Sequence, residues 1–415
     1  MSTKHPDIAQ RAIPLLVLLI GAGLLWSRAL LSLALAAFLL TSLLAAPWAG
    51  HLRFLRKHPV LLLFPLWFLP PLLSGLWSTD TAAWLRSLQL KAPLLLIPLG
   101  GLPLSRMERT SLRQLAYMLS FLLVADILRS IGYFLLHPDT IVDAYLQAKV
   151  LPVGMHQDHV RYGWMLVVVW MVCLWLRQQP TVASNRIDRY WLNVLIGLIF
   201  FFQHLLASKT GLLGTYVTGL VWLILQARTS AKRWAWLILV APILAYALLP
   251  TFRNRLRFVR WDFQHYTRGS YTEGLSDAPR LISMQAGWSC WQQQPWLGTG
   301  FGDIRNAMNV WYLHHQPELK TYEQLLPSNQ WLYYGMASGW PGFLLACFAA
   351  LAPFFVAPLR KQFLWAGFHL VAVLGFLYEI GLETQFGILL YALAGSWIYV
   401  LLMKDDATDS VVLRS

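Results

Sequence analysis

The sequence predicts an all-α, polytopic membrane protein with about twelve transmembrane helices and one large helical outer loop. Hydrophobic residues make up 57% of the 415 residues and charged residues only 13%, whereas a soluble domain carries about 25% charged residues. The 21 tryptophans suit a chain with two membrane interfaces, where this residue is enriched. Apolar runs near the length of about 20 residues that spans a bilayer follow one another along most of the chain.

Twelve apolar runs are candidate spans, although the fourth is short. Spans one to nine place a transmembrane region at 1–250, spans ten to twelve place another at 329–403, and 404–415 is a cytoplasmic tail. Between them, 251–328 is the one segment large enough to form a small domain. The spans lie near 12–27, 29–48, 59–77, 91–104, 114–135, 161–176, 190–207, 210–227, 234–250, 329–358, 364–382 and 385–403.

Basic residues orient these spans. With a cytoplasmic N-terminus every inner segment is basic, as the positive-inside rule requires, and the short outer segments carry fewer cations. Both termini are then cytoplasmic, and the 251–328 loop lies on the outer face, where membrane scaffolds usually carry function. Examples of the inner clusters are Arg53, Arg56 and Lys57, then Arg228, Lys232 and Arg233, then Arg360 and Lys361.

The remaining composition argues against several kinds of partner. A net charge of +14 in so apolar a chain indicates basic cytoplasmic loops rather than a nucleic-acid partner. The three cysteines are scattered without a CxxC pair, which argues against a zinc site. We therefore expect no metal, no cofactor and no nucleic acid. We also expect no cleavable signal peptide, because the first apolar run leads into a second without a small-residue cleavage site.

The outer loop contains a helix that carries an informative arginine. In "SDAPRLISMQAGWSCWQQQPWLGTGFGD", Ser276 or Asp277 caps the helix, and Pro295 and the following glycines end it. Arg280 lies in the first turn, where free backbone N–H groups and a guanidinium together bind anions well. The alternative is an ion pair between Arg280 and Asp277. Upstream, Arg253, Arg257 and Arg260 share one helical face, which suits either lipid phosphates or an anionic substrate.

Further charges gather where the spans reach the outer face. His159 and Arg161 lie at the mouth of span six, and Lys209 lies between spans seven and eight. Arg161, Lys209 and Arg280 would lie at one level of one face, which suggests a pyrophosphate or another anionic lipid headgroup. The alternative is ion pairing with Asp158 and the two carboxylates at the end of span eleven, Glu379 and Glu383. A transporter could use the same cations.

His314 and His315 follow in the outer loop. Two adjacent histidines point apart in either regular structure, so a shared metal ion is not expected. Either ring could still reach a cleft at the membrane surface, although a lone surface histidine usually has no such role.

Four motifs together resemble the O-antigen ligase and O-antigen polymerase superfamily, in its ligase-like branch, whose membrane domain has C-type glycosyltransferase (GT-C-like) character. The most specific family motif is His, then Asn, Ser or Gln, then nine residues and Gly-x-x-Gly. Here Asn329, Gly339 and Gly342 fit that spacing, but Ser328 replaces the histidine. The other three matches are "SDAPR" with "PWLGTG", Ser208-Lys209, and the run containing Glu379, Glu383, Gln385 and Gly387.

This resemblance implies a metal-independent, inverting glycosyltransferase at the periplasmic face of the bacterial inner membrane. The implied donor is an undecaprenyl-pyrophosphate-linked glycan, and the implied acceptor is a hydroxyl of the lipid A core. Arg280 and Lys209 would hold the pyrophosphate with Arg161 nearby, and Asn329 would orient a substrate hydroxyl. His159 and Glu383 are further candidate substrate-binding residues.

Ser328 raises the question of the general base. A serine hydroxyl has no useful basicity near neutral pH, so it cannot replace imidazole. Either another group is the base, with His314, His315, His156 and Glu323 as candidates, or catalysis is slow, or the chain only binds the lipid-linked glycan. A repeat-unit polymerase and a protein O-glycosyltransferase are enzymatic alternatives. A transporter should show internal repeats, and we find none in the sequence.

Overall fold

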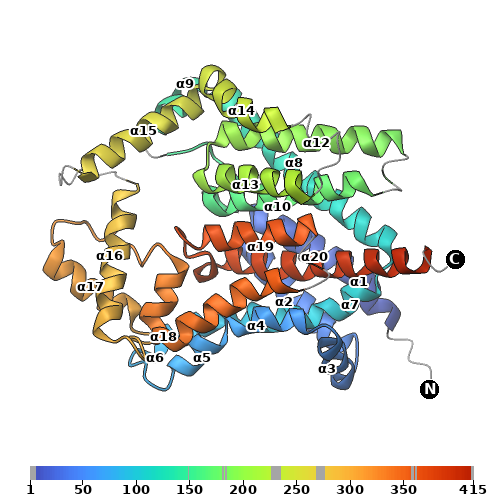
Figure 1. Ribbon diagram of the computed structural model, residues 1–415, viewed down its shortest axis with the longest axis horizontal. Coiled ribbons are helices and arrows are strands. Elements are labelled where there is room, and N and C mark those ends of the chain that lie inside the picture. The colour runs from blue at the N-terminus through green and yellow to red at the C-terminus, as the bar shows by residue number, and fades with distance from the viewer. Residues whose placement is uncertain are drawn as a thin grey trace.

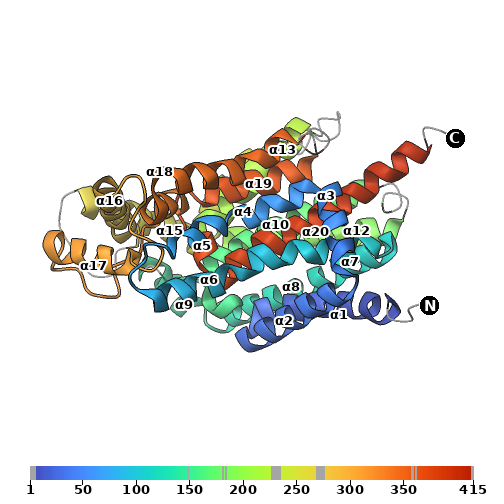
Figure 2. The same ribbon diagram turned by 90° about the horizontal axis from the view of Figure 1, so that it is seen from below.

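The computed structural model describes residues 6–147, 149–179, 182, 185–225, 235–267, 276–356, 359 and 362–412. Within these ranges the chain is helical and contains no strand, which confirms the all-α class. The helices form an elongated bundle, with both chain ends near one end and α16 and α17 at the other (Figures 1 and 2). The inner basic residues Arg228, Lys232, Arg233, Arg360 and Lys361 lie outside the described ranges.

Most of the predicted spans coincide with long helices. By length and composition, six helices can cross a membrane, and a seventh crossing results if α2 and α3, which meet at 95°, form one broken span. Five shorter apolar helices among the described residues coincide with the remaining predicted spans. The chain is therefore a multi-pass helical membrane protein, while twelve crossings remain a prediction.

The bundle helices alternate with short connecting turns. Their bounds are α1 (Pro6–Trp26), α2 (Arg28–Leu44), α3 (Trp48–Lys57), α4 (Leu63–Leu66), α5 (Leu69–Ser74), α6 (Thr81–Leu96), α7 (Gly101–Arg106), α8 (Arg109–Leu136), α9 (Pro138–Ala144), α10 (His159–Gln178), α12 (Arg186–Leu206), α13 (Lys209–Leu225), α14 (Ala235–Leu248), α18 (Gln330–Leu351), α19 (Phe363–Gly375) and α20 (Gln385–Val412). The outer-loop helices are α15 (Pro250–Thr267), α16 (Ala278–Gln293) and α17 (Ile304–His315).

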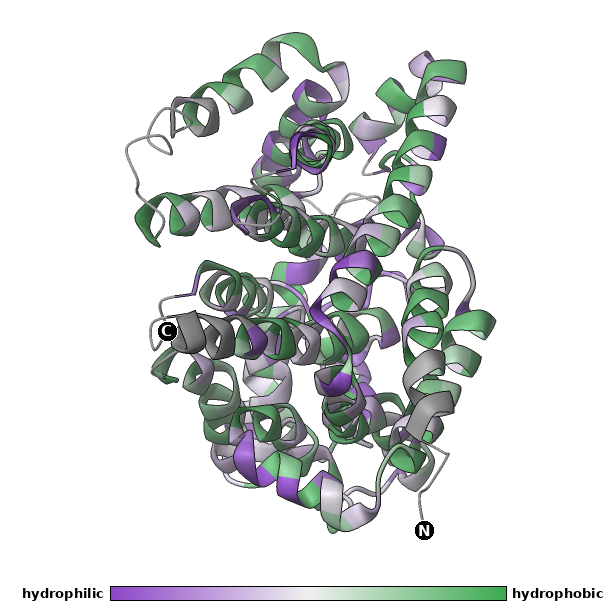
Figure 3. Ribbon diagram, turned by 90° about the vertical axis from the view of Figure 1, so that its right-hand side faces the viewer, coloured by the Kyte–Doolittle hydropathy of each residue, from purple (hydrophilic) through white to green (hydrophobic). Residues whose placement is uncertain are grey.

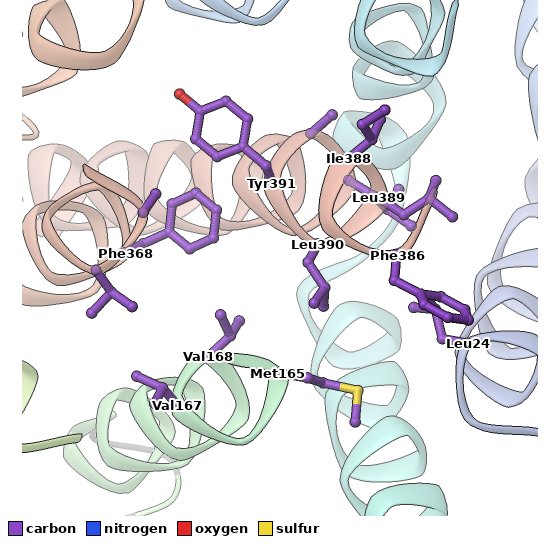
Figure 4. Close-up of a cluster of buried hydrophobic side chains, with 14 of the residues drawn as sticks. Leu24, Met165, Val167, Val168, Phe368, Phe386, Ile388, Leu389, Leu390 and Tyr391 are labelled. Carbon is purple, nitrogen blue, oxygen red and sulfur yellow. The ribbon is translucent and has the colours of Figure 1, made fainter. Parts of the chain in front are cut away.

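Helix α20 is the centre of the bundle. Its first 20 residues are predominantly apolar on every side, which is typical of a helix surrounded by protein or lipid, and most of them are buried. Leu389 and Leu390 of α20 face Met165 and Val168 of α10 across the core (Figure 4). Apolar residues predominate on the surrounding helices in the end view of Figure 3, as expected for surfaces that meet lipid.

A helix break joins the outer loop to the bundle. Inside α18, Gly339 has φ 62°, a value that favours glycine, and an added Cβ would lie 2.1 Å from the Trp296 carbonyl oxygen. The break leaves the carbonyls of Met336 and Ala337 free to accept the backbone N–H groups of Thr299 and Gly300 at 2.8 and 2.9 Å. Gly339 of the Gly-x-x-Gly motif and Gly300 of "PWLGTG" therefore allow the segment after α16 to pack closely against α18.

Candidate active site

The centre of the candidate site is the Glu379 loop, which we define as residues 376–384 between α19 and α20. Donors from three other regions of the chain bind successive carbonyl groups of this loop. These donors belong to α10, α16 and the start of α18, which are far from the loop in the sequence. The three helices therefore meet at this loop. The bonds join Gln330 N to Phe376 O (2.8 Å), Asn329 Nδ2 to Leu377 O (2.8 Å), Arg280 Nη1 to Tyr378 O (3.1 Å) and Arg161 Nη2 to Ile380 O (3.4 Å).

Glu379 joins two of the predicted cations. Its carboxylate lies 3.2 Å from Arg161 Nη2 and also pairs with Arg280 Nη1. Arg161 has a second carboxylate partner, Asp158, at 3.5 Å. The Arg280 side chain remains 30% exposed, against 11% for Glu379. Arg280 is thus held by the loop and still reachable from solvent.

Lys209 reaches the same cluster through α16. Its ammonium pairs with Asp277, the residue that precedes α16 and stands three positions before Arg280. The sequence alternative of an Arg280–Asp277 ion pair is therefore wrong, because Asp277 takes Lys209 and Arg280 takes Glu379. The second alternative, ion pairing of the three cations with Asp158, Glu379 and Glu383, is confirmed for Arg161 and Arg280 with Asp158 and Glu379. It is wrong for Lys209, which pairs with Asp277, and for Glu383, which pairs with Lys91.

A narrow cleft opens beside the cluster between α10, α13 and α19. Charged and apolar groups are separated along its lining: Arg161 and Glu379 lie at one part, and aliphatic and aromatic side chains form the rest. Such a lining suits a molecule with an anionic group attached to an apolar one. The apolar lining includes Val160, Trp164, Val371, Ala372 and Phe376.

Glu383 lies in a different environment from Glu379. It pairs with Lys91 of α6, whose side chain is fully buried, and it accepts a hydrogen bond from Gln330 Nε2 at 3.1 Å. The Lys91 ammonium also lies 5.1 Å from the centre of the Phe301 ring. The structure therefore does not bring Glu383 to the arginines by any contact within the described ranges. The position of Lys91 in the apolar run "LQLKAPLLL" is a sequence signal for burial.

Ser328 is buried against the helix that carries Arg280. Its Oγ lies 3.1 Å from Ser283 Oγ, and its backbone N–H donates to the same hydroxyl at 3.0 Å. Ser283 in turn donates to the Arg280 carbonyl at 2.7 Å. The position where the family motif carries histidine is thus coupled to the backbone of Arg280.

Asn329 serves the fold with both ends of its amide. Its Oδ1 caps α18 by accepting from Leu332 N at 2.9 Å, and its Nδ2 donates to Leu377 O at 2.8 Å. The amide nitrogen carries a second N–H, which is the group available to a substrate hydroxyl.

His159, His314 and His315 differ in their distance from the cluster, and His156, the fourth candidate, is exposed before the start of α10. His159 begins α10, is half-buried, and is close enough to Arg280 and Glu379 to interact with them electrostatically. His314 and His315 are exposed at the end of α17, where each Nδ1 bonds a carbonyl of its own helix. Within the described residues no contact joins His314 or His315 to the Glu379 loop.

Sequence reasoning overlooked three residues here: Lys91, Gln330 and Arg255. Gln330 links the Glu383 carboxylate to the start of the Glu379 loop. Its side chain donates to Glu383, and its backbone N–H donates to Phe376 O. Arg255 is a buried arginine of α15 with electrostatic links to Arg280 and Lys209. Among the described residues we find no group of three or more His, Cys, Asp or Glu side chains able to hold a metal ion.

The fold and site define a class: a multi-pass helical membrane protein with a cluster of arginine and lysine side chains around one loop at the end of the bundle. Residues 192–347 match the family model described as O-Antigen ligase. This range contains Lys209, Arg280, Ser328 and Asn329, so the resemblance to the O-antigen ligase and polymerase superfamily is confirmed there. No curated protein matches the chain.

Proposed function

We propose that this protein is a glycosyltransferase that transfers a glycan from an undecaprenyl-pyrophosphate carrier to an acceptor hydroxyl, with the lipid A core as the acceptor. The observation that carries the proposal is the convergence of Arg161, Arg280 and Lys209, from three helices, beside a cleft with apolar walls. A polyprenyl pyrophosphate has this pairing of properties, because its charged diphosphate is attached to a hydrocarbon chain.

The proposed topology has twelve crossings, with both termini cytoplasmic and the cation cluster at the periplasmic face of the bacterial inner membrane. Both chain ends lie at the end of the bundle opposite α16 and α17, which supports this orientation (Figure 1). The five shorter apolar helices and the bent α2–α3 pair supply the crossings beyond the six long ones. Residues 251–328 then form the periplasmic loop domain.

In the proposed reaction the acceptor oxygen attacks the anomeric carbon while the bond from that carbon to the pyrophosphate oxygen breaks. The bond pair leaves with the pyrophosphate, and the acceptor proton passes to a base. Arg280 and Lys209, with Arg161 nearby, stabilise the negative charge that grows on the leaving group. Displacement in a single step inverts the anomeric centre and needs no metal ion in this scheme. When substrate binds, Arg161 and Arg280 exchange the Glu379 carboxylate for the diphosphate.

The general base in this scheme is a histidine. His159 is close enough to Arg280 and Glu379 to interact with them electrostatically, but its burial opposes the protonated form that a base must reach. His314 and His315 would require movement of α17 toward the cluster. Ser328 is the observation that favours a second function, in which the chain binds the lipid-linked glycan without transferring it, because a serine cannot accept the proton efficiently.

The test uses the purified full chain, an undecaprenyl-pyrophosphate-linked glycan and two acceptors, lipid A core and a second repeat unit, without added metal. Release of the carrier is measured. We expect Arg280→Ala to slow release by about 100-fold, as for loss of one charge-stabilising donor, and Arg305→Ala, an exposed arginine of α17, to leave it unchanged. Carrier release that is equally fast in Arg280→Ala and in the parent would refute the proposed site.

The same assay separates the candidate bases. Variants His159→Ala, His314→Ala and His315→Ala are compared, and the base variant should lose about 10²–10⁴-fold. A large increase with Ser328→His would show that the parent chain lacks an efficient base. Binding of the donor without any release by the parent chain would support the non-catalytic alternative.

A further inference from the structure

Arg255 is a buried cation at the edge of the cluster. It lies on α15 and is 6% exposed. Arg257 and Arg260 of the same helix, which the sequence singled out, are exposed. At 100° per residue, Arg255 and Arg257 point about 200° apart, so Arg255 faces the protein when Arg257 faces away.

The guanidinium of Arg255 lacks the partners that its neighbours have. Its Nε and Nη1 atoms are buried without a hydrogen-bond partner, and no carboxylate lies within ion-pair distance among the described residues. The Arg255 guanidinium lies over the Phe258 ring, whose centre is 5.7 Å from Cζ. By contrast, Lys209 and Arg280 each hold a carboxylate.

Neither nearby acid is bonded to Arg255. Asp277 pairs with Lys209, and Asp262 Oδ2 accepts the backbone N–H groups of Ser276 and Asp277 at 2.9 and 2.7 Å, while Asp262 Oδ1 is buried without a hydrogen-bond partner. Burial lowers the pKa of Arg255, and the charge of Asp277 partly opposes this. An arginine nevertheless stays protonated in proteins, so the site holds a buried positive charge without a bonded counter-ion. Buried charges of this kind are normally paired or hydrogen-bonded.

We propose that Arg255 is a further substrate-binding residue, which binds one phosphate of a diphosphate group while Arg280 and Lys209 bind the other. The inference rests on the proposed function, since it assigns a fourth cation to the same headgroup. Arg255 is close enough to both Arg280 and Lys209 to interact with each electrostatically, although the three residues belong to three helices. The planar guanidinium provides two parallel N–H groups that match a phosphate edge. Binding would supply the counter-ion that the ligand-free site lacks.

The test compares Arg255→Met with Arg257→Met, a matched change on the exposed face of the same helix. The full chain in detergent micelles is titrated with inorganic pyrophosphate and, separately, with undecaprenyl pyrophosphate, and the melting temperature of each ligand-free variant is recorded. We expect Arg255→Met to weaken binding about tenfold, the usual scale of one charged hydrogen bond, without lowering the ligand-free melting temperature. Arg257→Met should alter neither quantity.

A purely structural arginine would behave in the opposite way. If Arg255→Met melts at a lower temperature and binds both ligands as tightly as the parent, the inference is wrong. If it does not fold, Arg255→Lys keeps the charge and loses the fork, so unchanged binding by that variant also refutes the inference. If the parent binds the lipid more tightly than inorganic pyrophosphate, the ligand is a lipid headgroup, and equal affinity for the two indicates a free diphosphate.

The outcome is separable from that of the proposed function. A parent chain that binds neither ligand contradicts the proposed carrier and the inference together. Binding that is lost in Arg280→Gln but retained in Arg255→Met contradicts the inference alone.

Discussion

Glu379 and Glu383 stand four positions apart in one loop and are both largely buried, yet their partners differ. Glu379 is shared between two arginines, and one of these is 30% exposed. Glu383 is paired with Lys91, whose side chain has no exposure, and is further held by Gln330. Glu379 lies in an irregular part of the loop, whereas Glu383 ends a short 3-10 turn at Gly381–Glu383. The two carboxylates therefore leave the loop in different directions.

The comparison shows that charge near a membrane can serve two purposes. A buried ion pair does not readily exchange one partner for a ligand, since separating the pair leaves a charge in a low-dielectric interior. A pair at the edge of a cleft can exchange its partner for an anionic ligand at much lower cost. We therefore interpret Lys91–Glu383 as a structural pair and Glu379 as the exchangeable partner of the binding arginines.

The largest effect is expected at the buried pair. Lys91→Met leaves Glu383 without its counter-ion and should destabilise the protein by about 3–5 kcal/mol. Chemical unfolding in detergent micelles measures this change, and Arg86→Met, an exposed position on the same helix, is the control.

Removing both charges sharpens that result. Lys91→Met with Glu383→Leu should recover much of the lost stability, because no unpaired charge remains. A double variant that is as unstable as Lys91→Met alone would show that packing, rather than charge, explains the loss.

The carboxylate shared by the two arginines should respond differently. Glu379→Gln keeps the shape, frees Arg280 from its carboxylate partner and leaves Arg161 paired with Asp158. We therefore expect a stability loss of about 1.5–3 kcal/mol and tighter binding of inorganic pyrophosphate, measured by titration calorimetry. Glu383→Gln is the matched change and should leave that affinity unchanged. Equal effects of the two variants on affinity would remove the distinction between the pairs.

Asn329 caps α18 and also bonds to Leu377 of the Glu379 loop, so its variants test how this loop is held. Asn329→Ala loses the α18 cap and the bond to Leu377, which should cost about 1–2 kcal/mol of unfolding free energy. Asn329→Asp keeps an oxygen for the cap but loses the Nδ2 donor, so it isolates the bond to the loop. Wild-type stability in Asn329→Ala would show that neither bond matters.

The smallest effect is expected at Asp303, an exposed carboxylate that serves as a reference. Burial alone would raise its pKa, but hydrogen bonds from the Thr79 hydroxyl and from the Thr79 and Asp80 backbone outweigh burial and lower the pKa below 3.8. Its folded-state pKa is depressed, so its contribution to stability is present above pH 4 and is lost as the pH falls through that lowered value.

The measurement for Asp303 is the melting temperature of the parent and of Asp303→Asn between pH 5 and pH 3. The difference between them should shrink as the pH falls. A difference that stays constant over this interval would show that the hydrogen bonds do not depend on the charge of Asp303.

Much of the fold and part of the site could be predicted from the sequence. The apolar runs, the α16 start at Asp277 and Pro279, and the glycines of α18 are local signals, and each corresponds to an observed element. The cations Arg161, Lys209 and Arg280 were recognised, because charges beside apolar runs are conspicuous. Arg255 was overlooked, because the three regularly spaced arginines Arg253, Arg257 and Arg260 lie on the other side of α15.

The sequence by itself determined the helices and the inventory of charges, since hydropathy and helix caps act over a few neighbouring residues. Only the tertiary structure decided which charges meet: Arg280 with Glu379 rather than Asp277, and Glu383 with Lys91. These pairs join distant segments, and their geometry depends on how the helices pack and where the Glu379 loop turns. That packing also buries Arg255 without a partner, a property that no local pattern contains.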